Sequence, residues 1–354
     1  MANHVLSLVF SIALLASSSL SFTLLGSPSF SRIVSKSDNQ LFQHSVELPN
    51  GDIVFAHSAE DPASFFFTEY HIDIICLDKH GAVKWDKTLK ADTIGSIAEM
   101  ALSQDGNVAL LIGGSYPEIA SQGLLLLKLD SQGNVIFNKV YYFYVIQSGG
   151  DLVATDDGGF VITGRGTIPF TDSNLKVFIA KIDAVGAVEW GVRSDDQSTD
   201  LITNEPIVTP QGDVVLGGYV SLSGNFYVKI DSAGSFEWAK SYGHPTDLIH
   251  SAELLSLSDG VLWCNSVLNP PSPSYLLFNK IDFQGNIVQS VKYSYGSGYE
   301  QAKDMILDGD GNIVVLSFIQ PDGGGVNLFS LMKLTLSLEF IAKRIYENDR
   351  DASP

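Results

Sequence analysis

The sequence is short of several features, and each shortage excludes a class of protein. It has two cysteines, Cys76 and Cys264, too few for a small secreted domain held together by disulfide bonds. Both lie in apolar, strand-like runs, so we expect them to be free and buried. Basic residues are also scarce, with 21 Lys and Arg against 40 Asp and Glu and a formal net charge of −19. This charge disfavours binding to nucleic acid and to anionic membrane surfaces.

Long hydrophobic runs are missing as well. The apolar run Val5–Ala16 has the length of a signal-peptide core and is too short to span a membrane. Together with the Ser-rich stretch that follows, it predicts a signal peptide over residues 1–21 and no transmembrane segment. We therefore expect a secreted or cell-surface protein, with the periplasm as an alternative location.

No segment shows the sustained 3.6-residue apolar period of an amphipathic helix, which predicts an almost entirely β protein. One pattern recurs instead: an apolar run ends in Leu-Asp or Ile-Asp, and two residues, a Gly and a second apolar run follow. Its copies are CLDKHGAVKW (76–85), KLDSQGNVIF (128–137), KIDAVGAVEW (181–190), KIDSAGSFEW (229–238), KIDFQGNIVQ (280–289) and the degenerate KLTLSLEFIA (333–342). Their aligned positions, which are Asp in five copies and Thr335 in the last, lie 48 to 53 residues apart. The chain is therefore a sixfold repeat.

A second marker lies midway through each repeat, where a short turn sequence precedes an apolar run. The six turns are Asn50-Gly51, Asp105-Gly106, Asp157-Gly158, Gln211-Gly212, Asp259-Gly260 and Asp310-Gly311. Asn-Gly and Asp-Gly between strands are typical of type I′ hairpins, which need positive φ at both central residues. Each repeat is thus predicted to form four antiparallel strands with tight turns after the first and third.

Four strands in about fifty residues are typical of a β-propeller blade. We expect a six-bladed β-propeller of four-stranded antiparallel blades over residues 41–347, with seven blades as the less favoured count. Residues 22–40 form an N-terminal segment containing a candidate ring-closing strand, and residues 348–354 form a tail. Regularly placed tryptophans close three of the repeats and predict inter-blade packing: Trp85, Trp190 and Trp238.

The repeats resemble a family of bacterial and archaeal secreted propeller repeats with a DGG strand followed by K-L-D-x-x-G-N-x-x-W-x-K-x-Y-G. The nearest copy here is KIDSAGSFEWAKSYG (229–243), and the resemblance extends over nearly all of the chain after residue 21. It implies export and a role at the cell surface or in an extracellular matrix, and it carries no catalytic residue.

Candidate ligand-binding residues lie on the face formed by the loops between second and third strands and between blades. Aromatic side chains there can stack on sugars or anchor a partner protein, while packing between blades is the competing interpretation. The candidates are Tyr141, Tyr142, Tyr144, Tyr242, Tyr295 and His250.

Oxygen-bearing side chains also alternate within one turn. Asp308, Asp310 and Asn312 have a spacing that can surround calcium, although the same Asp-Gly turn recurs elsewhere without the partner acids. Calcium is therefore the only cofactor we consider, and turn chemistry is the competing explanation.

The sequence contains no nucleophile elbow, Walker loop, HExxH motif or redox pair. We therefore expect a non-enzymatic, exported structural or interaction module that binds a protein partner or self-assembles. The alternative is a carbohydrate-binding or carbohydrate-active propeller that uses the variable-loop face.

Overall fold

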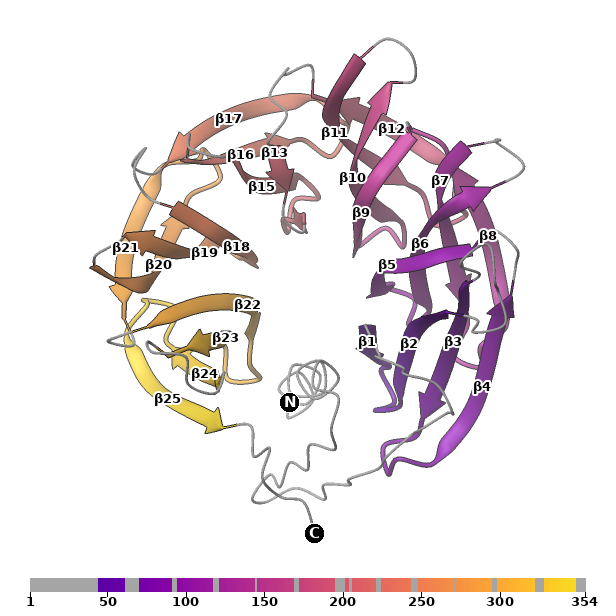
Figure 1. Cartoon of the computed structure of the whole chain (residues 1–354), viewed down its shortest axis with the longest axis horizontal. Helices are drawn as coiled ribbons and strands as arrows, with labels where there is room; N and C mark the ends of the chain where they lie inside the picture. Colours follow the sequence, from indigo (N-terminus) through magenta and orange to yellow (C-terminus); the bar gives the residue numbers. More distant parts are fainter. Residues whose placement is uncertain are drawn as a thin grey trace. The chain divides into compact units, whose positions relative to one another are not determined.

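A computed structural model gives the fold of the chain (Figure 1). It describes residues 44–60, 70–90, 94–116, 121–143, 145–168, 172–194, 201–203, 206–220, 224–242, 248–269, 272–294, 298–321 and 328–347. The predicted signal peptide, the ring-closing segment and the C-terminal tail lie outside these residues. The chain divides into two compact units, one extending to Gln197 and the other beginning at Ser198, and we describe each by itself.

The N-terminal unit contains three antiparallel sheets, each made of four strands in chain order. The first sheet contains β1 (His44–Glu47), β2 (Ile53–Glu60), β3 (Tyr70–Leu77) and β4 (Val83–Lys90). The second contains β5 (Ile94–Leu102), β6 (Val108–Tyr116), β7 (Ser121–Leu129) and β8 (Val135–Tyr141). The third contains β9 (Val145–Ala154), β10 (Phe160–Ile168), β11 (Asp172–Ile182) and β12 (Val188–Arg193).

The C-terminal unit also contains three antiparallel sheets. The fourth sheet of the chain contains β13 (Leu201–Thr203), β14 (Ile207–Val208), β15 (Val214–Val220), β16 (Gly224–Ile230) and β17 (Phe236–Tyr242). The fifth contains β18 (Leu248–Leu257), β19 (Gly260–Asn269), β20 (Ser272–Ile281) and β21 (Ile287–Tyr293). The sixth contains β22 (Tyr299–Leu307), β23 (Ile313–Gln320), β24 (Leu328–Leu334) and β25 (Phe340–Glu347).

One first strand is divided. In the fourth sheet both β13 and β14 pair with β15, and Pro206 lies between them. Proline has no N–H to donate to a neighbouring strand, so it interrupts the ladder here. The two short strands together occupy the place of one, and the sheet remains a four-stranded blade with a broken first strand.

The predicted fold class is confirmed: the protein is an all-β, six-bladed β-propeller of antiparallel four-stranded blades. The described residues contain no helix, and therefore none able to span a membrane. The number of blades could be predicted because each blade is built from local hairpins, and the residues that form each turn are adjacent in the sequence.

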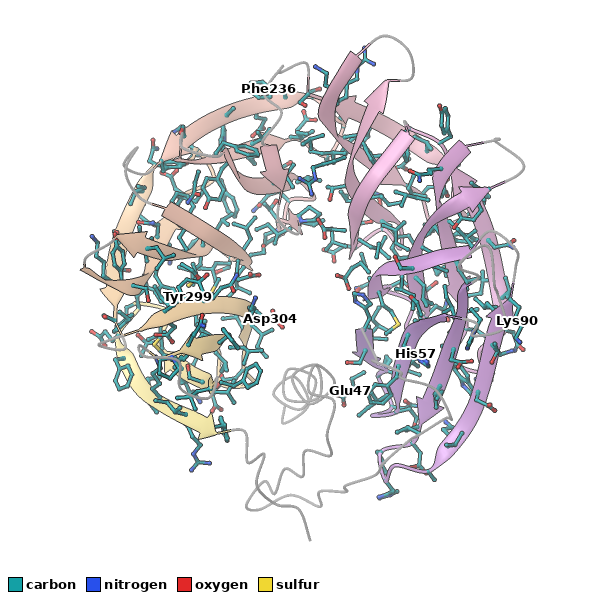
Figure 2. All side chains as sticks on the ribbon, viewed as in Figure 1. Glu47, His57, Lys90, Phe236, Tyr299 and Asp304 are labelled. Carbon is teal, nitrogen blue, oxygen red and sulfur yellow. The ribbon has the colours of Figure 1, made fainter. Side chains whose placement is uncertain are left out.

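The second strand of each blade is the most deeply buried, because both of its faces are covered. In β6, Val108, Leu110 and Ile112 enter one apolar core, while Ala109 and Leu111 enter the core on the opposite face. Burying each valine, leucine or isoleucine side chain in this way contributes roughly 1.5–3 kcal/mol. The fourth strands are open on one side: Figure 2 shows Lys90 and Phe236 there, on β4 and β17, and Phe236 is 63% exposed.

The turn prediction was correct in position in five of the six repeats and wrong in type. In the fifth repeat Gly260 already belongs to β19 and pairs with Leu257. Positive φ occurs at Gly51, whereas Asn50 is not among the described non-glycine residues with positive φ. The N–H of Gly51 donates to the carbonyl of Leu48 at 2.9 Å, and the N–H of Leu48 donates to the carbonyl of Asp52 at 2.8 Å. This is a type I turn followed by a left-handed glycine, the usual three-residue hairpin loop. A type I′ turn would have required positive φ at the Asn as well.

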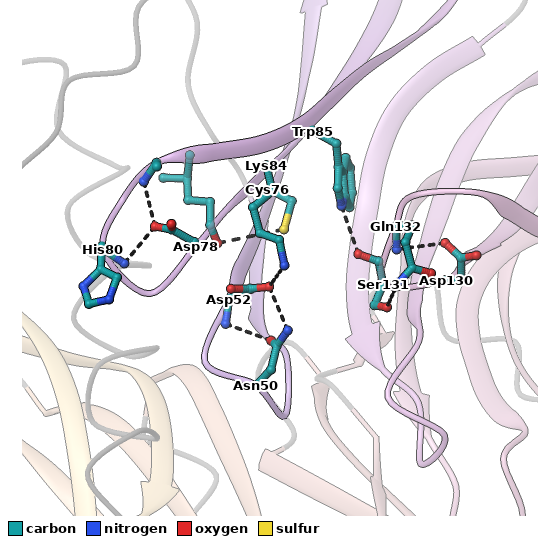
Figure 3. A network of polar contacts seen from close by, with 12 residues as sticks. Asn50, Asp52, Cys76, Asp78, His80, Lys84, Trp85, Asp130, Ser131 and Gln132 are labelled. Carbon is teal, nitrogen blue, oxygen red and sulfur yellow. Dashed lines mark hydrogen bonds and ion pairs between the residues drawn. The ribbon is translucent and has the colours of Figure 1, made fainter.

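The lysine of the repeated Lys-Leu-Asp and Lys-Ile-Asp sequences binds the acidic hairpin turn of its own blade. Lys128 Nζ lies 2.9 Å from Asp105 Oδ2, and Lys181 Nζ lies 2.7 Å from Asp157 Oδ2. The first blade has Cys76 at this lysine position, and Lys84 of β4 binds the turn residue Asp52 instead (Figure 3). Cys76 and Cys264 are both free and buried, as expected.

Fourth-strand aromatic residues join neighbouring blades within each unit. The indole N–H of Trp85 donates to the carbonyl of Ser131 in the next blade at 3.0 Å (Figure 3). Trp238 makes the equivalent bond to the carbonyl of Phe283, also at 3.0 Å. These two tryptophans therefore occupy the predicted inter-blade packing position.

Candidate active site

One position on the first strand of the blades carries a titratable side chain in every blade where it is described. In the first blade this position is the residue that pairs with the fourth residue of the second strand. Each of the other blades has an equivalent position. The residues are His44, Glu99, Asp151, Glu253 and Asp304, paired with Ala56, Leu111, Thr163, Cys264 and Leu316. We call these five residues the first-strand titratable positions.

The sequence contains a signal for this set that the strand and turn motifs alone do not reveal. Each member lies six residues before the first residue of its hairpin turn, as His44 does before Asn50 and Asp304 before Asp310. Glu205, six residues before Gln211, completes the series in the fourth repeat but lies outside the described residues. Turn and strand patterns dominate the repeat, so a recurring charge becomes visible only after the register is known.

In the N-terminal unit, His44 and Glu99 meet directly. Their strands, β1 and β5, are adjacent, and His44 Nδ1 lies 3.0 Å from Glu99 Oε1. The same carboxylate oxygen accepts the backbone N–H of Met100 at 2.8 Å. A register shift in β5 between Ile97 and Glu99 accompanies this arrangement, since a bulge turns a side chain away from its regular direction.

Asp151, on the adjacent β9, has a strongly shifted pKa. Burial, and to a smaller extent the nearby carboxylate of Glu99, raises its pKa to about 6. The hydroxyl of Thr163, 3.3 Å from Asp151 Oδ2, and the guanidinium of Arg165 oppose the shift. Asp151 therefore changes between its acid and carboxylate forms near neutral pH, which a solvent-exposed aspartate does not do.

The C-terminal unit repeats part of this geometry. Figure 2 shows Asp304 on β22, and its Oδ1 accepts the backbone N–H of Met305 at 2.7 Å, as Glu99 accepts that of Met100. A register shift between Ala302 and Asp304 again precedes the acid. Glu253 lies on the adjacent β18, and it helps to raise the pKa of the buried Cys264 thiol. The carboxylates are thus a feature of the repeat, and the histidine is particular to the first blade.

The N-terminal group, His44, Glu99 and Asp151, can perform acid–base chemistry. Two neighbouring carboxyl groups in unequal environments separate into a proton donor and a proton acceptor. A group with a pKa near the working pH is the most effective proton-transfer catalyst. Asp151 meets that condition, while Glu99 lies in a hydrogen bond with an imidazole.

Two of the tyrosines predicted to bind ligand, Tyr141 and Tyr242, are used in packing between blades. Tyr141 is 7% exposed, and its hydroxyl donates to the carbonyl of Gly186 in the next blade at 2.7 Å. The hydroxyl of Tyr242 donates to the carbonyl of Gly285 in the same manner. Tyr142, the residue that follows β8, is 46% exposed. Tyr144 and Tyr295 lie outside the described residues, as does the side chain of His250, whose backbone belongs to β18.

The residues considered for calcium form a turn held by a lysine. Asp308 Oδ1 accepts the backbone N–H groups of Asp310 and Asn312, each at 2.9 Å. The ammonium of Lys333 lies 2.5 Å from Asp308 Oδ2 and 3.8 Å from Asp310 Oδ2. A calcium ion at this turn would have to displace the ammonium, and calcium binding here stays a prediction.

Two more clusters of polar side chains are buried, one in the first blade and one in the sixth. In the first blade His57 Nε2 lies 3.7 Å from Asp73 Oδ2, and His71 Nε2 lies 3.5 Å from the same oxygen. In the sixth blade Glu300 Oε1 lies 2.6 Å from Lys343 Nζ and accepts the hydroxyl of Ser317 at 2.5 Å. No group of three His, Cys, Asp or Glu side chains among the described residues has the geometry of a metal site.

Comparison with known proteins identifies relatives by fold only. Neither family models nor curated proteins match this chain. An ulvan lyase of polysaccharide lyase family PL25 has a TM-score of 0.54 at 8% identity, over 88% of this chain and 82% of that one. The polysaccharide lyase Uly1 has a TM-score of 0.52 at 11% identity, over 84% and 78%. An α-L-arabinanase of Penicillium chrysogenum, solved with arabinobiose, has a TM-score of 0.44 at 10% identity, over 71% and 93%.

These comparisons overturn the expected non-enzymatic role. The two lyases share the propeller architecture over most of both chains, and both are carbohydrate-active enzymes. We expected a purely structural module because the sequence contains no familiar linear motif. The absence of such a motif does not exclude a catalytic group. In a propeller, however, catalytic residues come from separate blades and leave no contiguous motif.

Proposed function

We propose that this protein is a carbohydrate-active propeller that cleaves glycosidic bonds by acid–base catalysis at the His44–Glu99–Asp151 group. The observation that carries the proposal is Asp151, a carboxyl group with a pKa of about 6 beside a second carboxylate. Such a pair is what glycosidic bond cleavage by hydrolysis requires. The polysaccharide lyases of similar fold support carbohydrate as the substrate class.

Each member of the group has a distinct role in this proposal. Asp151 gives its proton to the glycosidic oxygen as the bond to the leaving sugar breaks. Glu99 takes a proton from the attacking water, so the proton count of the enzyme is restored after exchange with solvent. His44, bonded to Glu99 at 3.0 Å, fixes the orientation of that carboxylate.

The test measures release of reducing ends from a panel of soluble plant and algal polysaccharides. Asp151→Asn keeps the shape of the side chain and removes its proton, and we expect a loss of about 10²–10⁴-fold in kcat/KM. Glu99→Gln should cause a loss of similar size. The control is Asp156→Asn, which changes an exposed aspartate of the neighbouring turn and should leave the rate unchanged. Cleavage that survives both substitutions at the site would refute the assignment.

A second candidate reaction is elimination at a uronic acid, and Arg165 is the observation that favours it. Its guanidinium acts electrostatically on Asp151, so a positive charge is present to bind a substrate carboxylate. Elimination leaves an unsaturated sugar that absorbs ultraviolet light, whereas hydrolysis does not. The absorbance of the products in the same assay therefore distinguishes the two reactions.

The proposal includes export, because a glycan-cleaving enzyme of this kind meets its substrate outside the cytoplasm. Residues 1–21 support export through their signal-peptide pattern. Expression of the full chain with a C-terminal tag, followed by mass analysis of the secreted product, tests this. Removal of about twenty N-terminal residues is expected, and an intact chain retained in the cytoplasm would contradict it.

A further inference from the structure

The residue opposite Asp151 on the neighbouring strand is unusual for its position. In four other blades, the second-strand residue that pairs with the first-strand titratable position has no hydroxyl group. These residues are Ala56, Leu111, Cys264 and Leu316. In the third blade the paired residue is Thr163 of β10, which is fully buried. A polar side chain where the other blades have none is a candidate for a functional role.

Thr163 donates a hydrogen bond to Asp151. Its hydroxyl lies 3.3 Å from Asp151 Oδ2, and among the described residues it is the one hydrogen-bond partner of this carboxyl group. The distance exceeds the range of about 2.5–3.0 Å that is usual for hydroxyl donors. Hydrogen bonds at catalytic groups are often long until the substrate binds. Thr163 therefore orients the carboxyl group through one of its two oxygens.

The backbone holds these two residues opposite each other. Gly150, the residue before Asp151, lies where β9 and β10 approach closely, because a Cβ atom there would lie 2.8 Å from the carbonyl oxygen of Thr163. Regular pairing of β9 with β10 extends as far as Gly150, and the register then shifts on both sides of Arg165. Irregularities of this kind are frequent next to active sites, where they direct a side chain.

Two charged groups also act on Asp151, and neither has the effect of the hydroxyl. The carboxylate of Glu99 on β5 favours the acid form, and the guanidinium of Arg165 on β10 favours the carboxylate form. Both act through their charge on the carboxyl group as a whole. The hydroxyl of Thr163 donates to a single atom, so it alone distinguishes Oδ2 from Oδ1.

We propose that Thr163 is a positioning residue that keeps the acidic proton of Asp151 on Oδ1. A hydroxyl that donates to Oδ2 makes that oxygen the acceptor, so the proton of the acid form resides on the other oxygen. The inference rests on the proposed function in one respect: Oδ1 is then the atom that gives its proton to the glycosidic oxygen. The carboxylate that remains keeps its bond to Thr163, which stabilises it.

The experiment follows the titration of Asp151 in the full chain by NMR, with aspartate isotopically labelled at its carboxyl carbon. The signal of Asp151 is the one that is absent from Asp151→Asn. Thr163→Val keeps the shape of the side chain, and should raise the pKa of Asp151 by about half a unit to one unit, because the donor to the carboxylate is gone. Below pH 6 it should lower kcat on the best substrate of the panel about tenfold and leave KM unchanged. Thr163→Ser retains the hydroxyl and should restore both the titration and the rate.

Thr155→Val is the matched control, since Thr155 is a buried threonine of the same blade whose hydroxyl donates to Asp157 in the hairpin turn. It should lower the unfolding midpoint and leave both the titration of Asp151 and the rate unchanged. The proposal is overturned if Thr163→Val titrates like the wild type, if Thr163→Ser titrates like Thr163→Val, or if an active wild type and Thr163→Val have the same kcat. The NMR titration needs no substrate, so it decides whether Thr163 holds the carboxyl group even if the wild type cleaves no polysaccharide, a result that would refute the proposed function alone.

Discussion

Leu338 shows how one residue can keep a turn that its sequence no longer specifies. It occupies the position of the repeat glycine in the sixth blade, and its φ of 59° makes it the one non-glycine residue with positive φ in the described chain. Its N–H still donates to the carbonyl of Thr335 at 2.9 Å, and its carbonyl accepts the hydroxyl of Tyr293 at 2.6 Å. Its side chain is 2% exposed within the core shared by the last two blades, so apolar burial offsets the backbone strain.

This balance predicts an unusual order of substitutions. Leu338→Ala loses about 2–4 kcal/mol of unfolding free energy, because it removes buried carbons and retains the strained φ. Leu338→Gly removes the same carbons but relieves the strain, and should therefore be about 1 kcal/mol more stable than Leu338→Ala. Urea unfolding measures both. At the control position Leu334, a buried strand residue, Ala should be more stable than Gly, and the same order at residue 338 would disprove the strain.

Asp151 predicts a dependence of stability on pH. Its pKa is raised from 3.8 to about 6 by folding, so the folded chain binds more protons than the unfolded chain between those values. Stability from this group is therefore fully present below pH 4 and is lost as the pH rises to 6. Asp151→Asn should raise the unfolding free energy at pH 7 by about 1–3 kcal/mol and have little effect at pH 4. Equal effects of the substitution at both pH values would contradict the raised pKa.

At the scale of elements, the tyrosines at the ends of fourth strands act as inter-blade ties. Tyr141→Phe removes the hydroxyl bond to Gly186 and leaves its carbonyl buried, so a loss of about 1 kcal/mol in unfolding free energy is expected. Tyr142→Phe, one residue along and half exposed, should change stability by less than about 0.5 kcal/mol. Chemical denaturation distinguishes the two, and equal losses would remove the packing role of Tyr141.

Some features of these elements could be predicted from the sequence, and others could not. Strand positions and blade boundaries could be predicted because turn residues such as Asp105-Gly106 act on their immediate neighbours. The turn type was wrong because Asp at the preceding position accepts either sign of φ, and the choice depends on strand register. The loop-face tyrosines were ambiguous for a similar reason, since burial of Tyr141 depends on a blade that is 45 residues away.

At the scale of the molecule, the sequence repeat makes the fold predictable but does not identify the site. A six-bladed scaffold needs the same apolar residues in every repeat, so the repeat average describes packing well. Chemistry arises where one repeat departs from that average or where neighbouring repeats bring like positions together. Glu99 and Asp151 are 52 residues apart in the chain, and only the adjacency of β5 and β9 makes one alter the pKa of the other.

The pH dependence of glycan cleavage tests the central claim most directly. With Asp151 as proton donor, kcat/KM on the best substrate of the panel should fall about tenfold per pH unit above pH 6. This alkaline limb should disappear in Asp151→Asn, whose residual rate should be low at every pH. A wild-type protein that cleaves no polysaccharide, or an Asp151→Asn variant that retains both the rate and the limb, would contradict the account.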